Sequence, residues 1–147
     1  MSTRIDRLSV VIVTWQGDDL LRTCLASLAR VYGTRPEIVV VDNANQASTR
    51  AVASAYANVT YVATSRNLGF AGGNNIGLKH CTREYVLLLN NDTVVHEDSL
   101  SPLIAFLERS PRIGIVQGTM NVPALDLQAA GRGSAKTRLP SEVVCGE

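Results

Sequence analysis

The run Tyr85-Val-Leu-Leu-Leu-Asn-Asn-Asp-Thr93 passes abruptly from apolar to polar side chains. Five apolar residues in succession predict a short strand that is buried on both faces, as in a parallel sheet. Three other apolar runs lead in the same way to polar or aromatic residues: 10–13 to Thr14-Trp15, 38–41 to Asp42-Asn43 and 59–63 to Arg66-Asn67. Because the carboxyl ends of parallel strands share one edge, these side chains are expected to converge on one cleft.

Short β-branched runs alternate with amphipathic segments along the chain, which is the pattern of repeated strand–helix–strand units. We expect strands over residues 8–14, 37–41, 59–63, 85–89 and 113–116, and one or two more within 119–127. Helices are expected from residue 18 and over 48–56, 74–80 and 100–108. The predicted fold class is therefore α/β, a Rossmann-like three-layer sandwich around a mostly parallel central sheet.

The composition describes a globular domain without a general affinity for polyanions. The 147 residues are 46% apolar and 18% charged, with a net charge of +1. Neither nucleic acid nor an anionic membrane is indicated as a partner, and no apolar run is long enough to be a transmembrane segment. The three cysteines form no CxxC pair, which favours a reducing cytosol, and Cys24 and Cys81 are expected to be core thiols.

The polar triplet Asn90-Asn91-Asp92 is the first candidate site. Asn and Asp are common in turns and helix caps, and that explanation stays open. The alternative is a cation site, because Mg²⁺ and Mn²⁺ take oxygen ligands and often use one carboxylate together with diphosphate oxygens.

Two further strand ends carry side chains suited to a nucleoside. Trp15, the only tryptophan, directly follows the first strand and offers a face for stacking on a base, although a core-edge position is equally open. Asp42 offers an acceptor for a pyrimidine NH or a ribose hydroxyl, although an Asp-Asn pair also suits a turn.

The loop over residues 66–75 is rich in glycine and asparagine, and Arg66 and its backbone N–H groups suit a phosphate. A tight connection is the alternative. Its glycines fit neither a P-loop nor a dinucleotide fingerprint. A dehydrogenase or a sugar nucleotidyltransferase would need a glycine-rich loop after the first strand, where the chain has the acidic stretch Gln16-Gly-Asp-Asp19.

Four stretches together resemble the N-terminal half of family 2 glycosyltransferases, with the nearest likeness to their rhamnosyltransferase-like bacterial branch. These stretches are Leu8-Ser-Val-Val-Ile-Val-Thr-Trp15, Val39-Val-Val-Asp-Asn-Ala44, Asn67-Leu-Gly-Phe-Ala-Gly-Gly-Asn-Asn-Ile-Gly-Leu78 and Tyr85-Val-Leu-Leu-Leu-Asn-Asn-Asp-Thr93. The resemblance implies a GT-A fold, a nucleotide-sugar donor and a divalent cation, Mg²⁺ or Mn²⁺. It also implies that Thr14 and Trp15 lie beside the base and that Asp42 contacts the base or the ribose.

The same resemblance implies roles near the diphosphate. Arg66 and Asn67 correspond to the family's donor-contacting loop. Asn90 and Asp92 correspond to the outer positions of its Asp-x-Asp motif, so Asp92 is expected to bind the metal and Asn90 and Asn91 to contact the donor. Asn90 replaces the motif's first aspartate, which removes one negative charge.

The implied function is that of an inverting, metal-dependent glycosyltransferase acting in surface polysaccharide synthesis. Its donor would be a UDP- or dTDP-sugar, and its acceptor a glycan or a lipid-linked glycan. Residues 1–131 are expected to form the nucleotide-sugar-binding part of a GT-A domain, and 132–147 a tail or the start of an incomplete acceptor-binding region. The expected location is cytoplasmic, including a peripheral position at the inner face of the membrane.

The chain is short for this family, whose second half carries the acceptor site and the catalytic base. The resemblance therefore implies a truncated C-terminal part, and the catalytic residues remain unassigned because none of the late acids, Asp126, Glu142 and Glu147, suits the role of base. The alternative function is a non-catalytic nucleotide-binding module, which would self-associate or be completed by a partner protein.

Overall fold

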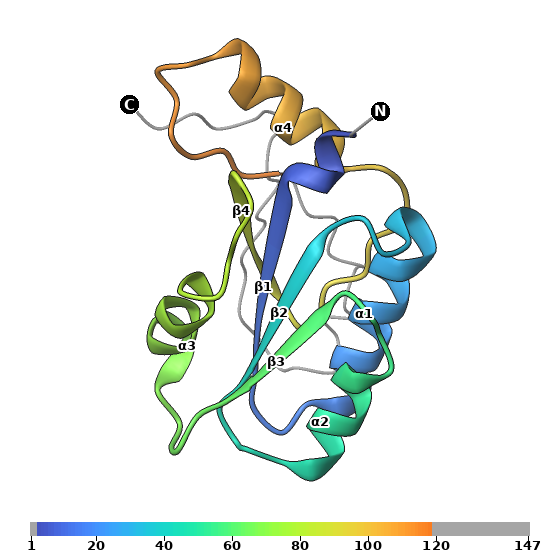
Figure 1. Cartoon of the computed structure of the whole chain (residues 1–147), viewed down its shortest axis with the longest axis vertical. Coiled ribbons are helices and arrows are strands. Elements are labelled where there is room, and N and C mark those ends of the chain that lie inside the picture. The colour runs from blue at the N-terminus through green and yellow to red at the C-terminus, as the bar shows by residue number, and fades with distance from the viewer. Residues whose placement is uncertain (1–2, 119–147) are drawn as a thin grey trace, which may run out of the picture.

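The computed structural model describes residues 3–118 (Figure 1). Its elements are η1 (Arg4–Arg7), β1 (Leu8–Thr14), α1 (Asp18–Tyr32), β2 (Glu37–Asp42), α2 (Ala47–Ser54), β3 (Val59–Ala63), α3 (Gly69–Leu78), β4 (Tyr85–Asn90) and α4 (Leu100–Arg109). Among these helices none has the length and apolarity needed to cross a bilayer.

The four strands form one parallel sheet in the order β3-β2-β1-β4. The register sets Thr14 beside Asp42 and Val13 beside Asn90, so the last residues of β1, β2 and β4 lie at one edge. β1 and β2 occupy the centre of the sheet and are buried along almost their whole length. The sequence prediction of an α/β fold with a parallel sheet is therefore confirmed.

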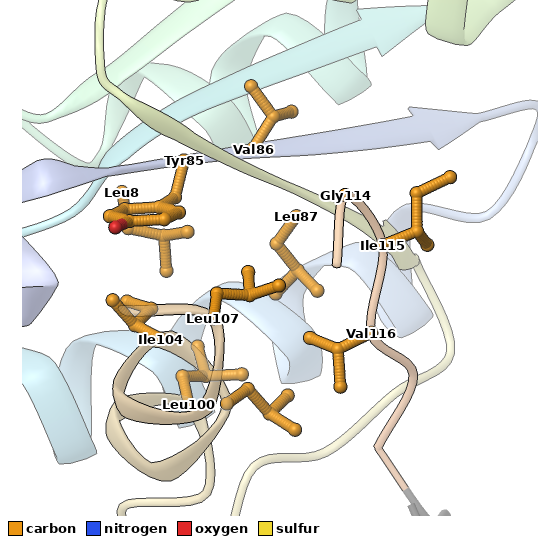
Figure 2. Close-up of a pocket in the computed structure, with 11 residues that line it drawn as sticks. Leu8, Tyr85, Val86, Leu87, Leu100, Ile104, Leu107, Gly114, Ile115 and Val116 are labelled. Atoms are coloured by element: carbon orange, nitrogen blue, oxygen red, sulfur yellow. The ribbon is translucent and has the colours of Figure 1, made fainter. Parts of the chain in front are cut away.

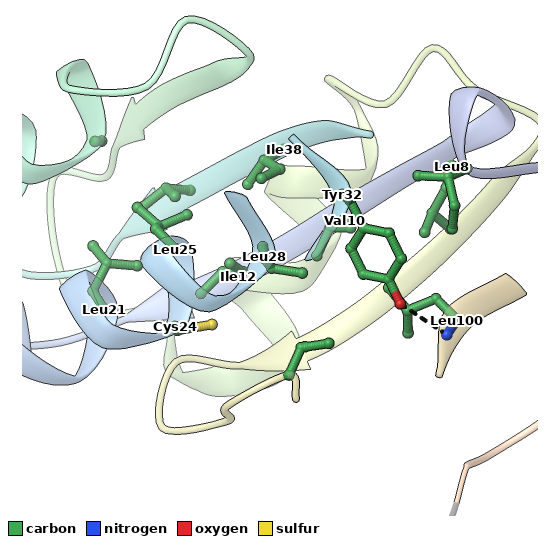
Figure 3. Packing of buried hydrophobic residues seen from close by; sticks show 14 of the residues in the cluster. Leu8, Val10, Ile12, Leu21, Cys24, Leu25, Leu28, Tyr32, Ile38 and Leu100 are labelled. Carbon is green, nitrogen blue, oxygen red and sulfur yellow. Dashed lines mark hydrogen bonds between the residues drawn. The ribbon is translucent and has the colours of Figure 1, made fainter. Parts of the chain in front are cut away.

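One face of the sheet carries the larger core. Val10 and Ile12 of β1 point to this face and pack with Leu25 of α1 (Figure 3). α2 covers the same face beside α1, and α4 joins through Leu100, whose backbone N–H donates to the Tyr32 hydroxyl at 3.0 Å (Figure 3). Alternate residues of a strand point to opposite faces, so a continuous apolar run supplies two cores.

The other face is covered by α3, which completes the three layers (Figure 1). Val11 and Val41 point to this face and are fully buried. A Cβ at Gly73 would lie 2.6 Å from a methyl of Val13, and one at Gly77 would contact Val11 even more closely. Glycine at these two positions lets the helix backbone lie directly on the sheet.

The predicted start of α3 was wrong, because the helix begins at Gly69 and takes in most of the segment expected to be a loop. Asn67 accepts a hydrogen bond from the Gly69 N–H at 2.8 Å, which satisfies a donor that helix formation leaves free. The close packing of Gly73 on the sheet then stabilises a sequence with low intrinsic helix propensity.

The strand expected over residues 113–116 is also absent from the part of the chain that the structure describes. These residues follow a turn closed by the Ile113 N–H and the Ser110 carbonyl, and Ile115 is 83% exposed. The other expected elements within residues 3–118 are present with ends shifted by at most two residues. Cys24 is buried and Cys81 half-buried, both as free thiols, whereas the strands expected within 119–127 lie outside the described residues.

Candidate functional site

The carboxyl edge of the sheet is held together by backbone bonds that continue beyond the strands. The Asn43 N–H donates to the Thr14 carbonyl at 2.9 Å, and the Thr64 N–H donates to the Asp42 carbonyl at 3.0 Å. These bonds keep the loops after β1, β2 and β3 in contact with one another. The sequence prediction that the strand ends converge on one edge is confirmed for Thr14, Asp42 and Asn90.

Asp42 lies inside this edge rather than on it. Its side chain is fully buried, and its two carboxylate oxygens accept three hydrogen bonds: from the Ala44 N–H at 2.8 Å, the Gln46 N–H at 2.7 Å and the Tyr61 hydroxyl at 2.8 Å. The carboxylate therefore shapes the turn that leads into α2. Contact with a nucleoside remains a prediction, and it requires one of these bonds, most simply the one to the Tyr61 hydroxyl, to be exchanged.

Asn43 and Thr64 fix the loop between β3 and α3. The Asn43 amide donates to the Gly69 carbonyl at 3.0 Å and lies 3.2 Å from the Thr64 hydroxyl. That hydroxyl lies closer to the Arg66 carbonyl, at 2.8 Å. The backbone on both sides of Arg66 is thus tied to the end of β2, while the Arg66 side chain stays exposed.

Asn91 connects the polar triplet after β4 to the end of β1. Its amide donates to the buried Thr14 hydroxyl at 3.0 Å. A Cβ at Gly17 would lie 2.8 Å from the same amide nitrogen, so glycine leaves room for this contact. Trp15 lies in this loop and is 55% exposed. This exposure is compatible with stacking on a base, which remains a prediction.

Asp92 provides a single exposed carboxylate at the end of β4. No group of three or more His, Cys, Asp or Glu side chains that suits a metal occurs within residues 3–118. The nearby Cys24 thiol is buried, and burial first and the charge of Asp92 second raise its pKa to about 12. One carboxylate beside amide oxygens fits Mg²⁺ or Mn²⁺ shared with phosphates, and does not fit a closed protein cage.

The predicted site residues divide into two groups. Those with exposed side chains are Trp15, Arg66, Asn67, Asn90 and Asp92, and those turned into the protein are Thr14, Asp42 and Asn91, which is half-buried. The Asn67 side chain also has an internal role, as the acceptor at the start of α3. The second group therefore positions the loops that carry the first.

Sequence reasoning missed three polar residues at this edge. Tyr61 and Thr64 bond to the end of β2, but a tyrosine or threonine near the end of a strand gives no signal of such a contact. Asn74 lies within the quoted glycine-rich stretch, yet it received no role. Its side chain is buried, and neither of its polar atoms has a hydrogen-bond partner.

An apolar cavity of about 130 Å³ lies elsewhere, between β4, α4 and the segment that follows α4 (Figure 2). Aliphatic side chains such as Leu87, Ile104 and Val116 form most of its wall. Among its lining residues the Tyr85 phenol is the one polar side chain, and none carries a carboxylate, imidazole or thiol. The polar edge of the sheet is therefore the better candidate for function.

Comparison with known proteins identifies the family to which this chain belongs. The sequence model described as glycosyl transferase family 2 matches residues 9–132, which include β2, β3, β4 and all of β1 except Leu8. The chain belongs to glycosyl transferase family 2. The family resemblance expected from the sequence is therefore confirmed, whereas the rhamnosyltransferase-like branch remains a prediction.

Curated relatives within this family take part in glycan synthesis. The chain is 30% identical over 105 residues to the low-salt glycan biosynthesis hexosyltransferase Agl10 of Haloferax volcanii, covering 69% of this chain and 33% of the relative. It is 21% identical to the poly-beta-1,6-N-acetyl-D-glucosamine synthase of Staphylococcus epidermidis, covering 81% of this chain and 30% of the synthase. The chain thus spans about a third of the length of these relatives.

Solved structures of the same fold agree with the family assignment. S. aureus TarS superposes with a TM-score of 0.62 at 27% identity, covering 70% of this chain and 20% of TarS. The mannosyltransferase PcManGT from Pyrobaculum calidifontis, solved in complex with GDP-Man and Mn²⁺, gives a TM-score of 0.69 at 23% identity, covering 79% of this chain and 36% of PcManGT. These similarities establish the GT-A-like α/β fold.

Proposed function

We propose that this chain is the donor-binding part of an inverting, metal-dependent glycosyltransferase that uses a UDP- or dTDP-sugar. The observation that carries the proposal is the arrangement of the sheet edge. Trp15, Arg66 and Asp92 are exposed there, and buried hydrogen bonds hold the loops that carry them. An aromatic face, a guanidinium and a carboxylate suit the base, the diphosphate and the cation of a nucleotide-sugar.

Each exposed residue has a distinct role in this proposal. Asp92, assisted by the Asn90 amide oxygen, would hold Mg²⁺ or Mn²⁺, which when bound would offset the charge of the departing diphosphate. Trp15 stacks on the base, and Arg66 binds the diphosphate. Asn67 contacts the donor only after giving up its bond to α3, so its first role is to position that helix.

The buried residues act mainly through position. Thr14 and Asn91 fix the distance between the base-stacking loop and the cation-binding loop. Asp42 orders the turn after β2 and reaches the nucleoside by exchanging its bond to the Tyr61 hydroxyl. Each of these residues thereby supports donor binding.

The acceptor side of the reaction is proposed by analogy with the relatives. The acceptor is a glycan or lipid-linked glycan in surface polysaccharide synthesis, and the enzyme acts in the cytoplasm, peripherally at the inner face of the membrane. The rhamnosyltransferase-like branch is part of this proposal. A second candidate is a non-catalytic nucleotide-binding module, which would use the same exposed residues at the sheet edge to bind the nucleotide.

Calorimetric titration tests donor binding directly. UDP, dTDP and GDP are titrated into the purified chain with and without MnCl₂, and circular dichroism checks that the chain is folded. We expect one uridine or thymidine nucleotide to bind, and to bind more tightly with Mn²⁺. A folded chain that binds none of the three would overturn the proposal, and preference for GDP would correct the donor class. Transfer of sugar to lipid-linked glycans then separates an enzyme from a binding module.

A further inference from the structure

The Asn74 side chain is an unpaired amide inside the protein. The residue is 5% exposed, and both its Oδ1 and its Nδ2 are buried without a hydrogen-bond partner. Buried amides are normally hydrogen-bonded, because an unpaired one loses its bonds to water and gains none in return. Within the described residues only the hydroxyl of Thr93 is a further buried side-chain atom of this kind.

The packing of α3 places this amide near the proposed cation site. Gly73 lies over Val13, and Val13 is paired in register with Asn90, whose side chain therefore points to the same face of the sheet. Ile76 packs against the cluster formed by Val11, Val39 and Val41. Successive helix residues are rotated by about 100°, so Asn74 lies on the opposite flank of α3, which faces β4.

The Asn43 amide, which lies close to Gly73, is already hydrogen-bonded elsewhere. The Asn43 amide lies 3.3 Å from the Cβ position of Gly73, but it already bonds the Gly69 carbonyl and the Thr64 hydroxyl. Asn74 thus has a free donor and a free acceptor at the carboxyl edge. A buried amide with no partner inside the protein is suited to hydrogen bonds with a bound ligand.

The chemistry of the amide selects among the parts of a donor. Phosphate oxygens accept hydrogen bonds and would satisfy only Nδ2, whereas a hydroxyl group both donates and accepts. Asn74 lies on the flank of α3 that faces β4 and Asn90. Ile76 lies on the opposite flank of this helix. We propose that Asn74 binds hydroxyl groups of the donor's sugar ring and so helps to select the transferred sugar. This assignment rests on the proposed function and adds the sugar subsite to it.

The test compares nucleotides with and without the sugar. UDP, UDP-glucose, UDP-N-acetylglucosamine, dTDP-rhamnose and GDP-mannose are titrated with MnCl₂ into the wild type, Asn74→Leu and the matched control Asn75→Leu, whose position is exposed. For the nucleotide-sugar that the wild type binds most tightly, Asn74→Leu is expected to weaken affinity about tenfold. The affinity of Asn74→Leu for the corresponding nucleoside diphosphate without the sugar should not change. The control Asn75→Leu should bind both ligands as the wild type does.

The binding data distinguish failure of the proposed function from failure of the Asn74 assignment. A wild type that binds no nucleotide overturns the proposed function and this assignment with it. A wild type that binds, while Asn74→Leu retains full affinity for the nucleotide-sugar, overturns only the assignment. Equal losses for diphosphate and nucleotide-sugar also overturn it, because Asn74 would then contact the ribose or the phosphates.

A readout without ligand completes the test. Because no protein group bonds the Asn74 amide, Asn74→Leu is expected to raise the thermal melting temperature while it lowers sugar affinity. A lowered melting temperature would show that the amide is satisfied within the fold, which would overturn the assignment. Asn75→Leu gives the baseline for an exposed substitution.

Discussion

At the scale of single residues, Asp42 is a buried carboxylate whose three hydrogen-bond donors all come from the protein. Two are backbone N–H groups in the turn that follows β2, and the third is the Tyr61 hydroxyl. Such a carboxylate stabilises a loop whether or not a ligand is bound. Its contribution to the fold can therefore be separated from any contribution to nucleotide binding.

The substitution Asp42→Asn tests this separation. The asparagine NH₂ group replaces one acceptor oxygen and leaves the N–H of Ala44 or Gln46 without a partner. We expect the free energy of unfolding to fall by about 1–3 kcal/mol, measured by urea denaturation. Asp92→Asn is the exposed control and should change it by less than about 0.5 kcal/mol. Unchanged stability of Asp42→Asn together with lost nucleotide binding would instead indicate a direct ligand contact.

Tyr61 gives the same network a pH dependence. Burial first, and then the hydrogen bond to Asp42 and its charge, raise the pKa of Tyr61 from 10.0 to about 12, while the Arg50 cation opposes the shift. The protonated phenol therefore stabilises the fold fully below its unfolded pKa, and this stability is lost as the pH rises through the folded pKa. Relative to Tyr61→Phe, the wild type should lose stability between about pH 10 and 12.

The measurement is the difference in phenolate absorbance between the wild type and Tyr61→Phe during alkaline titration. The difference should appear with a midpoint near about 12 or together with unfolding. A midpoint near the ordinary value of 10.0 would mean that the bond to Asp42 is not maintained in solution.

Asp92 is the residue on which metal dependence should rest. Asp92→Ala removes the single exposed carboxylate at the end of β4, so Mn²⁺ should no longer strengthen nucleotide binding, while metal-free affinity and stability should be unchanged. Calorimetry with and without MnCl₂ measures both affinities. Metal enhancement that persists in Asp92→Ala would remove Asp92 from this role.

At the scale of secondary-structure elements, the four strands could be predicted because short runs rich in β-branched and apolar residues end at polar turn residues. α3 could not be placed correctly, because its glycines oppose helix formation locally and are favoured only by contact with the sheet. The segment over residues 113–116 is apolar, but pairing in a sheet needs a partner strand, and local sequence does not provide one. Both errors concern tertiary contacts that a single sequence does not show.

Some features of the candidate site could be predicted from the sequence and others could not. Trp15 and Asp92 could be predicted because they directly follow apolar runs, and the topology of a parallel sheet places them at one edge. The internal bonds of Asn91 and Thr14, and the unpaired amide of Asn74, depend on distances between elements. Residue type and order do not reveal those distances.

The glycines of α3 lead to a prediction for this element. A Cβ at Gly77 would contact Val11 closely and lie 3.2 Å from Val41, so Gly77→Ala should push the helix from the sheet. We expect a loss of about 1–3 kcal/mol in the free energy of unfolding, measured by urea denaturation. Gly114→Ala is the matched control, because nothing lies within 4 Å of its added methyl group. Equal effects of the two substitutions would contradict the packing argument.

At the scale of the whole molecule, the sheet is asymmetric. β4 pairs only with β1 among the described strands, and it carries exposed apolar side chains on one face. Val86 and Leu88 point to the face that α3 covers over β1 and β2, yet they are 41% and 48% exposed. Ile115 adds further apolar surface beside them. An exposed apolar edge strand is a common site of association between chains.

We therefore expect the purified chain to self-associate through β4 as its concentration rises, which sedimentation velocity would detect. Leu88→Lys should shift the distribution towards monomer, because a charged side chain opposes pairing of edge strands. The control Leu20→Lys alters an equally exposed leucine, 51% exposed, on α1, which covers the opposite face of the sheet from Leu88, and should leave association unchanged. If both substitutions had the same effect, general surface charge rather than the β4 edge would govern association. If the wild type stayed monomeric throughout, the free edge of β4 would be protected in solution despite its apolar side chains.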